Sequence, residues 1–569
     1  MSLSHHPVRH AAKALLASAS LASALLCPVL ASAQNPRQIA QITQSLSPES
    51  QQAITRLGTF NMLPAQEWRY HPGDLPHGEA ADLNDSAWQV VNGRAQASTE
   101  AAWYRRVIEV PSNLNGYDLT GARIWFQFAA APNGAVPQII YFNGRRVALG
   151  EDLEPIILFD QARPGDKVLV AVKLAQTAAN KTFTGARLKI DFSATRPNPD
   201  DLRSEFISAA ALIPRLSKAP AQDLVTLQAA ITDVDLKALD ANNASAFDAS
   251  LVKARTQLEQ LKPMMQQATL HITGNSHIDA AWLWPESETM DVVKRTFSTA
   301  LQLMNEYPDY HYTQSAAQYN EWIADKYPAI NDEIRKRIKE GRWEVVGGMW
   351  VEPDLNMPDG ESQVRSLLIG KRFFQQQYGV DVRIGWNPDS FGYNWQLPQI
   401  YKRSGVDYFV TQKMTWSDTN QLPFKLFWWQ SPDGSKVLTY FPQGYANGNL
   451  SPIRLTTDLA QAIQRAPGME EMMDLYGVGD HGGGPTRAVL DEGQHWAQPD
   501  KIIPNIQSGS AQSFFSDVEK KVAAPSTEWN YNSIAKGYTY PAAVEGKIDI
   551  PTWNDEMYLE FHRGVFTTQ

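Results

Sequence analysis

The stretch LHITGNSHID, residues 270–279, decides the expected fold of the second half of this chain. Residues 270–274 have the short, apolar character of a buried strand, and polar residues follow at once. His277 and Asp279 are two positions apart, so on an extended backbone both side chains point to the same face. A His and an Asp placed in this way can chelate one divalent cation. The stretch therefore predicts a buried strand that ends in a metal-binding pair.

Further strand-like segments follow, and helical stretches separate them. The expected strands are 343–347, 382–386, 408–411, 437–441 and 475–479, and the expected helices between them include 291–305, 331–340 and 361–378. Strands that alternate with helices in this way are typical of an α/β domain with a largely parallel sheet.

Polar motifs fall just past the ends of these strands. They are His277 and Asp279, Glu352 and Asp354, Asp389, Gln412 and Trp416, and finally Asp480 and His481. Parallel α/β folds place their sites at the carboxyl edge of the sheet, so we expect these side chains to gather there. A single loop carboxylate is usually a cap or a surface group, but several motifs at one edge favour a functional site.

Two of these loops contain proline or glycine residues that constrain or free the backbone. In WNPDSFG, residues 386–392, Pro388 restricts the backbone on both sides and holds Asp389 on a rigid turn. GVGDHGGGPT, residues 477–486, is rich in glycine and carries an acid near its start. A phosphate-binding loop is the alternative, but the Lys-Ser/Thr pair of a P-loop is missing and the charge is wrong for phosphate. Glycines that let a sugar approach the backbone fit better.

The first half of the chain has a different organisation. Residues 59–195 contain short runs rich in β-branched and aromatic residues, separated by turn signals such as Asn143-Gly144, and this spacing predicts a β-sandwich. The fragments WYRRVIEVP and YFNGRRVALGEDLEP resemble the galactose-binding-like jelly-roll domains attached to many glycosidases. Such a domain would bind sugar or pack against a catalytic domain, and we favour packing. We expect residues 34–58 to be a helical or linking segment and residues 196–268 to be a helical linker.

The first 33 residues have the pattern of a secretory signal. Arg9 and Lys13 supply the charged start, residues 14–30 are apolar, and Ala31-Ser32-Ala33 is a small-x-small cleavage site. A membrane anchor is the alternative, but the apolar stretch is shorter than the ~20 residues that a span needs. We therefore expect a secreted or periplasmic protein.

Composition limits the remaining function classes. The net charge of -10 provides no basic field for nucleic acid or anionic lipid. We expect no membrane span, and the oligomeric state stays open. The only cysteine, Cys27, lies in the signal, so the mature chain would have no disulfide and no Cys-ligated metal. The 17 Trp and 20 Tyr indicate either a large aromatic core or platforms for sugar faces.

Four motifs together resemble glycoside hydrolase family 38, the α-mannosidases. They are HIDAAWLWP (277–285), GRWEVVGGMWVEPDLNMPDGES (341–362), WNPDSFGYNWQLPQI (386–400) and GVGDHGGGPT (477–486), in the family's order. The likeness is to the branch with the cytosolic, vacuolar and many bacterial enzymes. It implies a barrel-like catalytic domain over 269–569 and a retaining exo-α-mannosidase that acts on glycans or oligosaccharides through a covalent mannosyl-Asp intermediate. Family members continue with a helical bundle and β-rich domains, so we expect this sequence to be truncated.

The resemblance also implies roles for individual residues. Asp389 matches the nucleophile, Trp282 the aromatic residue beneath the sugar, and Asp354 a carboxylate that holds sugar hydroxyls, and we add Trp416 to the substrate-binding set. Asp480 matches the acid/base. His481 stands where a second acid would be and would share or take that role, and Tyr445 stands where some relatives carry an acid, which leaves the acid/base assignment open.

The family's metal site uses two His and two Asp, one of which is the nucleophile. His277, Asp279 and Asp389 match three of these ligands. For the fourth we favour His562 over His481, because residues 559–569 resemble the family's helix-entry motif. Nitrogen and oxygen ligands without cysteine suit Zn²⁺ best, with Co²⁺ or Ca²⁺ as alternatives.

Two other classes of function stay open. A metal-dependent polysaccharide deacetylase also uses an Asp and His metal site, but the Trp282 platform and the rigid turn at Asp389 favour a glycosidase. A non-catalytic carbohydrate-binding protein with a decayed site is the other alternative. The presence of all the matched acids argues against it.

Overall fold

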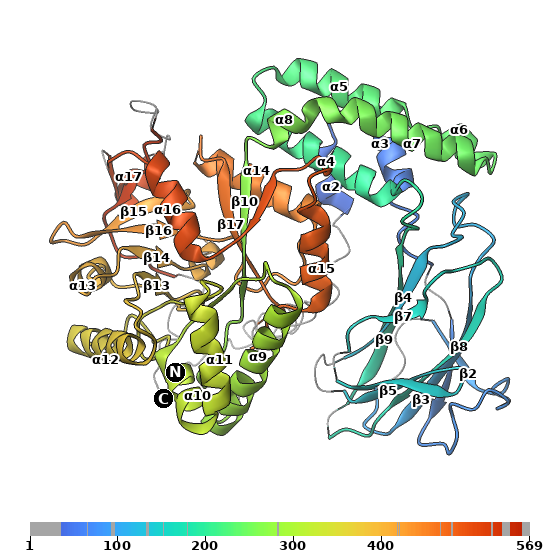
Figure 1. Ribbon diagram of the computed structural model, residues 1–569, viewed down its shortest axis with the longest axis horizontal. Coiled ribbons are helices and arrows are strands. Elements are labelled where there is room, and N and C mark those ends of the chain that lie inside the picture. Colours follow the sequence, from blue (N-terminus) through green and yellow to red (C-terminus); the bar gives the residue numbers. More distant parts are fainter. Residues whose placement is uncertain are drawn as a thin grey trace, which may run out of the picture. The chain divides into compact units, whose positions relative to one another are not determined.

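The helices and strands of the chain fall into two compact units (Figure 1). The first comprises residues 1–206 and 226–258, and the second comprises residues 207–225 and 259–569. The structure is a computed structural model. It describes residues 36–559 except 65–66, 93–96, 132–135, 152, 179, 282–283, 418, 420, 467, 480–481, 525–526 and 537–546. The expected signal over 1–33 lies outside the described residues.

The first unit contains two antiparallel sheets. Its strands are β1 Trp68–Pro72, β2 Gln89–Val91, β3 Ala102–Glu109, β4 Arg123–Ala131, β5 Gln138–Phe142, β6 Arg145–Gly150, β7 Ile156–Phe159, β8 Lys167–Leu174 and β9 Thr182–Asp191. Six strands form one sheet in the order β2-β1-β3-β8-β5-β6, and β7-β4-β9 form the other. The sheets face each other through aromatic side chains, such as Trp68 and Phe128 with ring centroids 5.7 Å apart. The galactose-binding-like topology stays a prediction.

The segment expected as a linker is helical and is divided between the units. The helices before β10 are α2 Pro36–Ile42, α3 Pro48–Leu57, α4 Pro199–Leu216, α5 Pro220–Thr232, α6 Leu236–Asp240, α7 Ala244–Leu258, η1 Glu259–Leu261 and α8 Lys262–Met265. Residues 207–225 and the residues from 259 onward belong to the second unit, and the rest of the segment belongs to the first. The linker role of residues 196–268 stays a prediction.

The second unit contains two sheets with mainly parallel strands. The strands are β10 Thr269–Asn275, β11 Tyr312–Gln314, β12 Trp343–Val345, β13 Ile384–Trp386, β14 Tyr408–Val410, β15 Leu426–Gln430, β16 Lys436–Tyr440, β17 Glu471–Tyr476, β18 Asn505–Ser508, β19 Glu528–Trp529 and β20 Thr552–Trp553. One sheet has the order β12-β11-β10-β17, with β18 also paired to β10, and the other has the order β13-β14-β16-β15-β20-β19. Only β15 and β16 pair antiparallel within these sheets. Five of the strands that the sequence predicted here are present, and the sixth, predicted over 475–479, is observed earlier in the chain, as β17 over Glu471–Tyr476.

The two sheets adjoin at β12 and β13, where the N–H of Gly347 donates to the carbonyl of Ile384 (2.7 Å). The pairings between described residues give two sheets, so the expected barrel-like closure stays a prediction.

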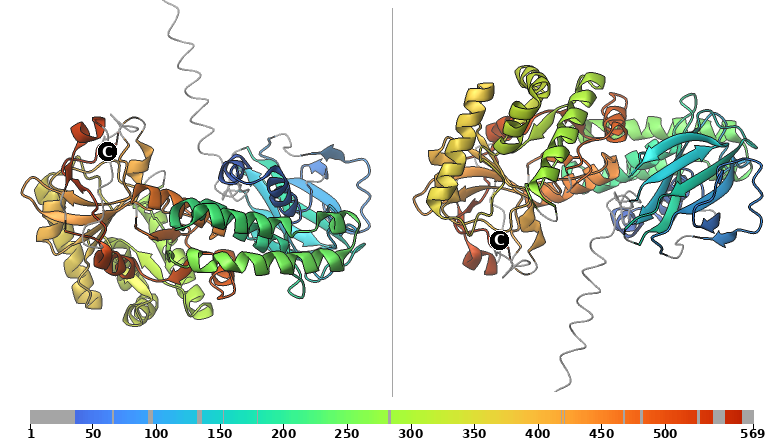
Figure 2. Two further views of the ribbon diagram at one scale, coloured as in Figure 1. Left: turned by 90° about the horizontal axis from the view of Figure 1, so that it is seen from above. Right: turned by 90° about the horizontal axis from the view of Figure 1, so that it is seen from below.

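Helices lie on the outer side of these strands in Figure 1 and in both views of Figure 2. They are α9 Glu286–Glu306, α10 Ala317–Lys326, α11 Pro328–Lys339, α12 Gly360–Tyr378, α13 Leu397–Arg403, α14 Pro452–Arg465, α15 Arg487–Trp496, α16 Ala511–Lys521 and α17 Tyr531–Ala535. The short helix η2 Lys413–Trp416 follows β14 directly. The three helices predicted from the sequence correspond to α9, α11 and α12. In the described part of the chain, no helix combines the length and the apolar character that crossing a membrane requires.

Strand β14 is buried on both faces. Tyr408 and Val410 belong to one apolar cluster, and Phe409, between them, belongs to a second cluster. Successive side chains on a strand alternate between faces, and parallel sheets are covered on both sides, so this division follows from the extended backbone. Trp429 and Trp553 are also buried in the second cluster, so part of the aromatic content serves the core. The packing on both faces therefore holds the end of β14, where the next loop begins, in place.

Glu344 on β12 holds the start of α16. Its carboxylate accepts from the backbone N–H groups of Ala511 (2.8 Å) and Gln512 (2.9 Å) and from the hydroxyl of Thr313 (2.7 Å). Glu344→Ala leaves these donors without that acceptor, so we expect a loss of roughly 2–3 kcal/mol in the unfolding free energy of this unit. Calorimetry should show its transition at a lower temperature. Glu344→Gln, which keeps one acceptor oxygen, should lose less, and an unchanged transition in Glu344→Ala would refute the role.

Candidate metal and catalytic site

His277 joins two carboxylates from separate loops. Its buried ring follows the end of β10, with Nε2 3.3 Å from Oδ1 of Asp279 and 3.5 Å from Oδ2 of Asp389. Nitrogen and oxygen atoms from the three side chains all lie within 4.8 Å of one another. A neutral imidazole and two carboxylates are donors that Zn²⁺ accepts, so these residues fit a divalent cation. The two sequence motifs that carry them place His277 and Asp389 112 residues apart in the chain (389 − 277), and they meet in one place as expected.

The turn that carries Asp389 is held from several sides. The N–H of Asn387 donates to the carbonyl of Val410 (3.0 Å) on β14, and its side-chain oxygen accepts from the hydroxyl of Tyr401 (2.6 Å). The N–H of Asp389 itself donates to Oε1 of Glu352 (2.8 Å). These bonds, together with the restricted backbone of Pro388, fix the direction of the carboxylate.

A buried lysine pairs with the same carboxylate. Nζ of Lys413, at the start of η2, forms an ion pair with Oδ1 of Asp389, and the lysine side chain is only 4% exposed. Its Nζ also lies 3.6 Å from the ring centroid of Trp416 and 4.7 Å from that of Phe391. Sequence reasoning selected Gln412 and Trp416 and passed over Lys413. The position of Lys413 just after a strand end was the signal that could have found it.

Neighbouring charges control the ionisation of Asp389 and His277. Burial raises the pKa of Asp389, but His277 and Lys413 outweigh it and lower that pKa to about 2. Burial lowers the pKa of His277, but Glu352, Asp279 and Asp389 outweigh it and raise that pKa well above its ordinary value. Asp389 is therefore an ionised carboxylate at neutral pH, as a nucleophile or a metal ligand must be.

Glu352 contacts both His277 and the Asp389 turn. Its Oε2 lies 3.3 Å from Nδ1 of His277, and its Oε1 accepts from the N–H of Asp389. A histidine that binds a metal through one nitrogen usually donates from the other to a carboxylate, which fixes the ring and its tautomer. Glu352 occupies that position. Sequence reasoning located this residue after a strand but gave it no role.

Tyr445 forms a wall of the site. Its buried ring packs edge-on against His277, with ring centroids 5.1 Å apart. Its carbonyl accepts from Nδ2 of Asn275 (2.9 Å), at the end of β10. At the position where sequence reasoning considered an acid, the structure therefore places a tyrosine ring that packs on the candidate metal ligand.

Two further residues that we expected in the site are described by the structure, and four are not. Oδ1 of Asp354 accepts from the N–H groups of Asn356 (2.7 Å) and Met357 (3.0 Å), so this carboxylate organises its own turn. Trp416 is 45% exposed beside Lys413. Four expected residues lie outside the described part of the chain: Trp282, Asp480, His481 and His562.

The first residue of the glycine-rich loop, Gly477, packs tightly against the backbone of Asn275. A Cβ on Gly477 would lie 2.1 Å from the carbonyl oxygen of Asn275, so only glycine fits there. The backbone of the loop therefore passes directly against the end of β10, close in sequence to His277.

Comparison with known proteins identifies the region that contains this cluster. Residues 267–556 match the family described as "Glycosyl hydrolases family 38 N-terminal domain", and His277, Asp279 and Asp389 lie within that range. The chain is 36% identical over 302 residues to "Alpha-mannosidase 2C1" of Homo sapiens, covering 53% of this chain and 26% of that protein. It is 35% identical over 302 residues to "Alpha-mannosidase" of Saccharomyces cerevisiae, covering 52% and 26%. The chain thus spans about a quarter of the length of these curated relatives.

Among solved structures, an alpha-mannosidase from Enterococcus faecalis V583 is similar with a TM-score of 0.41 and 19% sequence identity, over 51% of this chain and 31% of that chain.

The contact of Glu352 with His277 predicts an effect on metal affinity. Glu352→Gln keeps the size of the side chain but removes the charge that faces Nδ1 of His277, so we expect affinity for Zn²⁺ to fall roughly 10–100-fold. Competition with a chromogenic chelator measures this affinity. Asp354→Asn, in the same loop, is the control and should bind as the unaltered protein does. Equal affinity in Glu352→Gln and in the unaltered protein would rule out the assigned contact.

Proposed function

This chain belongs to glycosyl hydrolase family 38, and from that premise we propose that it is an exo-α-mannosidase that hydrolyses α-linked mannose with retention of configuration. One observation carries the proposal: His277, Asp279 and Asp389 converge within the residues that match the family. The two curated relatives described above are named α-mannosidases. Glycans or oligosaccharides that end in α-mannose are the substrates that we propose.

We assign the role of nucleophile to Asp389. Its low pKa keeps the carboxylate ionised, and the bonds around its turn hold it in one direction. In the first step one carboxylate oxygen bonds to the anomeric carbon as the bond to the leaving oxygen breaks, which gives a mannosyl ester. In the second step water attacks the same carbon and the ester bond breaks. Two displacements restore the original anomeric configuration.

The proton required by the leaving oxygen is assigned to the glycine-rich loop. Asp480 would donate it in the first step and then take a proton from the attacking water in the second. His481, next in the sequence, shares this role or takes it over. Retaining enzymes hold their two carboxyl groups ~5–5.5 Å apart, which is the separation that we expect between Asp389 and Asp480.

Lys413 is the residue that we add to this machinery. Its ammonium pairs with the buried carboxylate of Asp389 and so helps keep the negative charge there before the sugar binds. Trp416 and Phe391, which lie against the same ammonium, present aromatic surface at the exposed side of the pair. With Trp282 beneath the sugar and Asp354 on its hydroxyls, they complete the substrate-binding set that we propose.

We propose that His277, Asp279, Asp389 and His562 hold a divalent cation, most favourably Zn²⁺, with Co²⁺ or Ca²⁺ as alternatives. When bound, the cation would supply positive charge to neighbouring hydroxyls of the sugar. Glu352 would orient His277 for this task through Nδ1. Asp389 would then serve both as a ligand and as the nucleophile.

The pattern of residues 1–33 supports export, and we propose that the enzyme acts in the periplasm or outside the cell. Its substrates would then be glycans or oligosaccharides in that compartment.

Replacing the nucleophile gives the first functional prediction. Asp389→Ala should lower turnover roughly 10⁴-fold or more while the protein still folds, because the variant lacks the carboxylate to which we assign the ester bond. A 2-fluoro-mannosyl fluoride probe should label Asp389 covalently, as mass spectrometry of peptides would reveal. Label on any other residue would disprove the assignment.

The acid/base assignment is tested by comparing leaving groups. Asp480→Ala should slow the hydrolysis of mannosides with poor leaving groups by roughly 10²–10⁴-fold, and aryl mannosides much less, because only the former need a proton on departure. If His481→Ala shows that pattern instead, His481 is the acid. Equal loss on both kinds of substrate in both variants would exclude the loop from acid catalysis.

Metal content distinguishes the two candidates for the fourth ligand. His562→Ala should lose most of its bound metal, as His277→Ala does, whereas His481→Ala should retain it. Elemental analysis of the purified variants measures this directly. An empty site in His481→Ala beside a full one in His562→Ala would reverse the assignment.

Release of mannose from an aryl α-mannoside also separates the proposal from the two alternatives. A deacetylase would use the same metal ligands to activate water and would release acetate but no mannose. A carbohydrate-binding protein with a decayed site would bind the sugar and release neither.

A further inference from the structure

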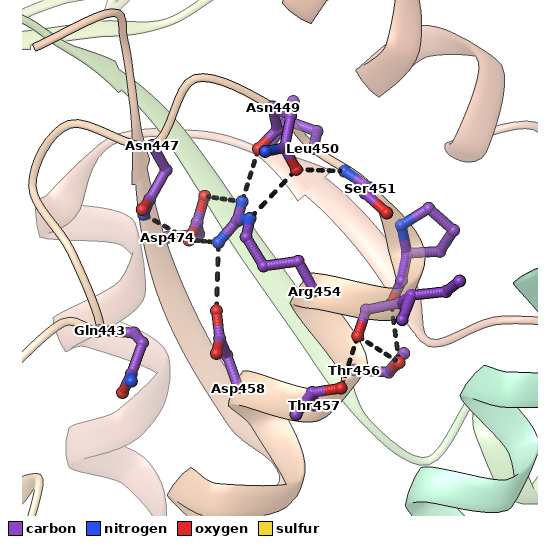
Figure 3. Close-up of polar contacts among 12 residues, drawn as sticks. Gln443, Asn447, Asn449, Leu450, Ser451, Arg454, Thr456, Thr457, Asp458 and Asp474 are labelled. Atoms are coloured by element: carbon purple, nitrogen blue, oxygen red, sulfur yellow. Dashed lines mark hydrogen bonds and ion pairs between the residues drawn. The ribbon is translucent and has the colours of Figure 1, made fainter. Parts of the chain in front are cut away.

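An ion pair with a buried carboxylate joins α14 to β17, the strand that neighbours β10 (Figure 3). Arg454, in the first turn of α14, donates from Nη1 and Nη2 to the two carboxylate oxygens of Asp474 on β17, at 2.7 and 2.9 Å. Nη1 also donates to Asp458 on the same helix (3.1 Å). The side chain of Asp474 is 1% exposed. Buried charges are tolerated only with close partners and further hydrogen bonds, so the geometry of their neighbours is tightly constrained.

Those further hydrogen bonds come from the loop 441–451, between β16 and α14. Nδ2 of Asn447 donates to Oδ1 of Asp474 (3.0 Å). The carbonyl of Asn449 accepts from Nη2 of Arg454 (2.6 Å), and its side-chain oxygen accepts from Nε (3.3 Å). Figure 3 shows these two asparagines on either side of the guanidinium and carboxylate groups. The ion pair between the half-buried Arg454 and the buried Asp474 therefore fixes the conformation of this end of the loop.

The other end of the loop reaches the candidate site. The ring of Tyr445 packs on His277, and its carbonyl accepts from Asn275. The carbonyl of Gln443 accepts from Nε2 of Gln412 (3.2 Å), next to Lys413. One short loop thus connects the ion pair to His277 and to Gln412, the residue before Lys413. His277 and Lys413 both face the carboxylate of Asp389.

Asn447 also joins the loop to the end of β17. Its N–H donates to the carbonyl of Leu475 (3.2 Å), and its carbonyl accepts from the N–H of Gly477 (3.0 Å). Gly477 starts the glycine-rich loop and has no room to move toward Asn275. A displacement of Asn447 would therefore disturb the start of the loop that carries Asp480 in the sequence.

We propose that Arg454, Asp474 and Asn447 are positioning residues, whose buried network sets the loop 443–449 against His277 and against Gly477. For its catalytic readout this inference rests on the proposed function. Its structural readout, the local exchange of backbone amides, does not depend on activity.

The test compares two aspartates that bind the same guanidinium. Asp474→Asn weakens the partner that also holds the loop, whereas Asp458→Asn, the matched control, weakens the contact with Arg454 within α14 and alters no described hydrogen bond of the loop. In Asp474→Asn we expect hydrogen–deuterium exchange in peptides covering 443–449 and 275–279 to rise about tenfold or more. We expect kcat on an aryl α-mannoside to fall roughly 10²-fold with KM little changed, because the bound sugar would meet misplaced groups. Asp458→Asn should keep exchange and kcat near those of the unaltered protein.

Asn447→Ala is the second variant and covers the case in which Asp474→Asn does not fold. It removes the contact of the loop with Asp474 but leaves the ion pair in place, and it should give the same pattern. Unchanged exchange in these peptides in the folded variants overturns the proposal. Raised exchange at 443–449 with unchanged exchange at 275–279 and unchanged kcat overturns it as well. If the unaltered protein releases no mannose, the proposed function fails, and exchange at 275–279 still decides this inference.

Discussion

An ionised carboxylate in a largely buried position requires positive charge nearby, and the site around Asp389 is organised by that requirement. Lys413 supplies it at Oδ1, and His277, when its ring is protonated, supplies it at Oδ2. As a metal ligand the ring would be neutral, and the cation would supply the positive charge instead. Without this positive charge, burial would push Asp389 toward its protonated form, which could neither attack a carbon atom nor bind a cation. Glu352 then balances the charge of His277 and holds the backbone of Asp389.

The α/β architecture makes this charge arrangement possible. His277 follows β10, Asp389 follows β13 and Lys413 follows β14, so three strands deliver three charged groups to one edge of their sheets. Parallel strands place their carboxyl ends together, and the buried faces of β14 give its loop a firm base. The loops past these ends, including the loop with Tyr445, then set the distances between the charged side chains, which the strands alone do not determine.

Local patterns in the sequence predicted the strands that are apolar and bounded by turns, and the motifs that end them. They failed for β11, whose residues Tyr312–Gln314 are too few and too polar to stand out. They also missed β15, although Asp433-Gly434 marks a turn between it and β16. His277, Asp279 and Asp389 could be selected because each lies in a distinctive motif. Lys413 and Glu352 each follow a strand, which marks them as candidates, but their roles could not be assigned because neither loop alone shows which side chain of another loop it contacts.

The central claim is that Asp389 forms a covalent bond to mannose and that the product therefore keeps its configuration. Proton NMR of the hydrolysis of an aryl α-mannoside, recorded before mutarotation mixes the anomers, tests this most directly. If Asp389 forms this bond, α-mannose appears first and the β-anomer grows in later. β-Mannose as the first product would contradict this claim, because inversion requires water, and not Asp389, to attack the anomeric carbon.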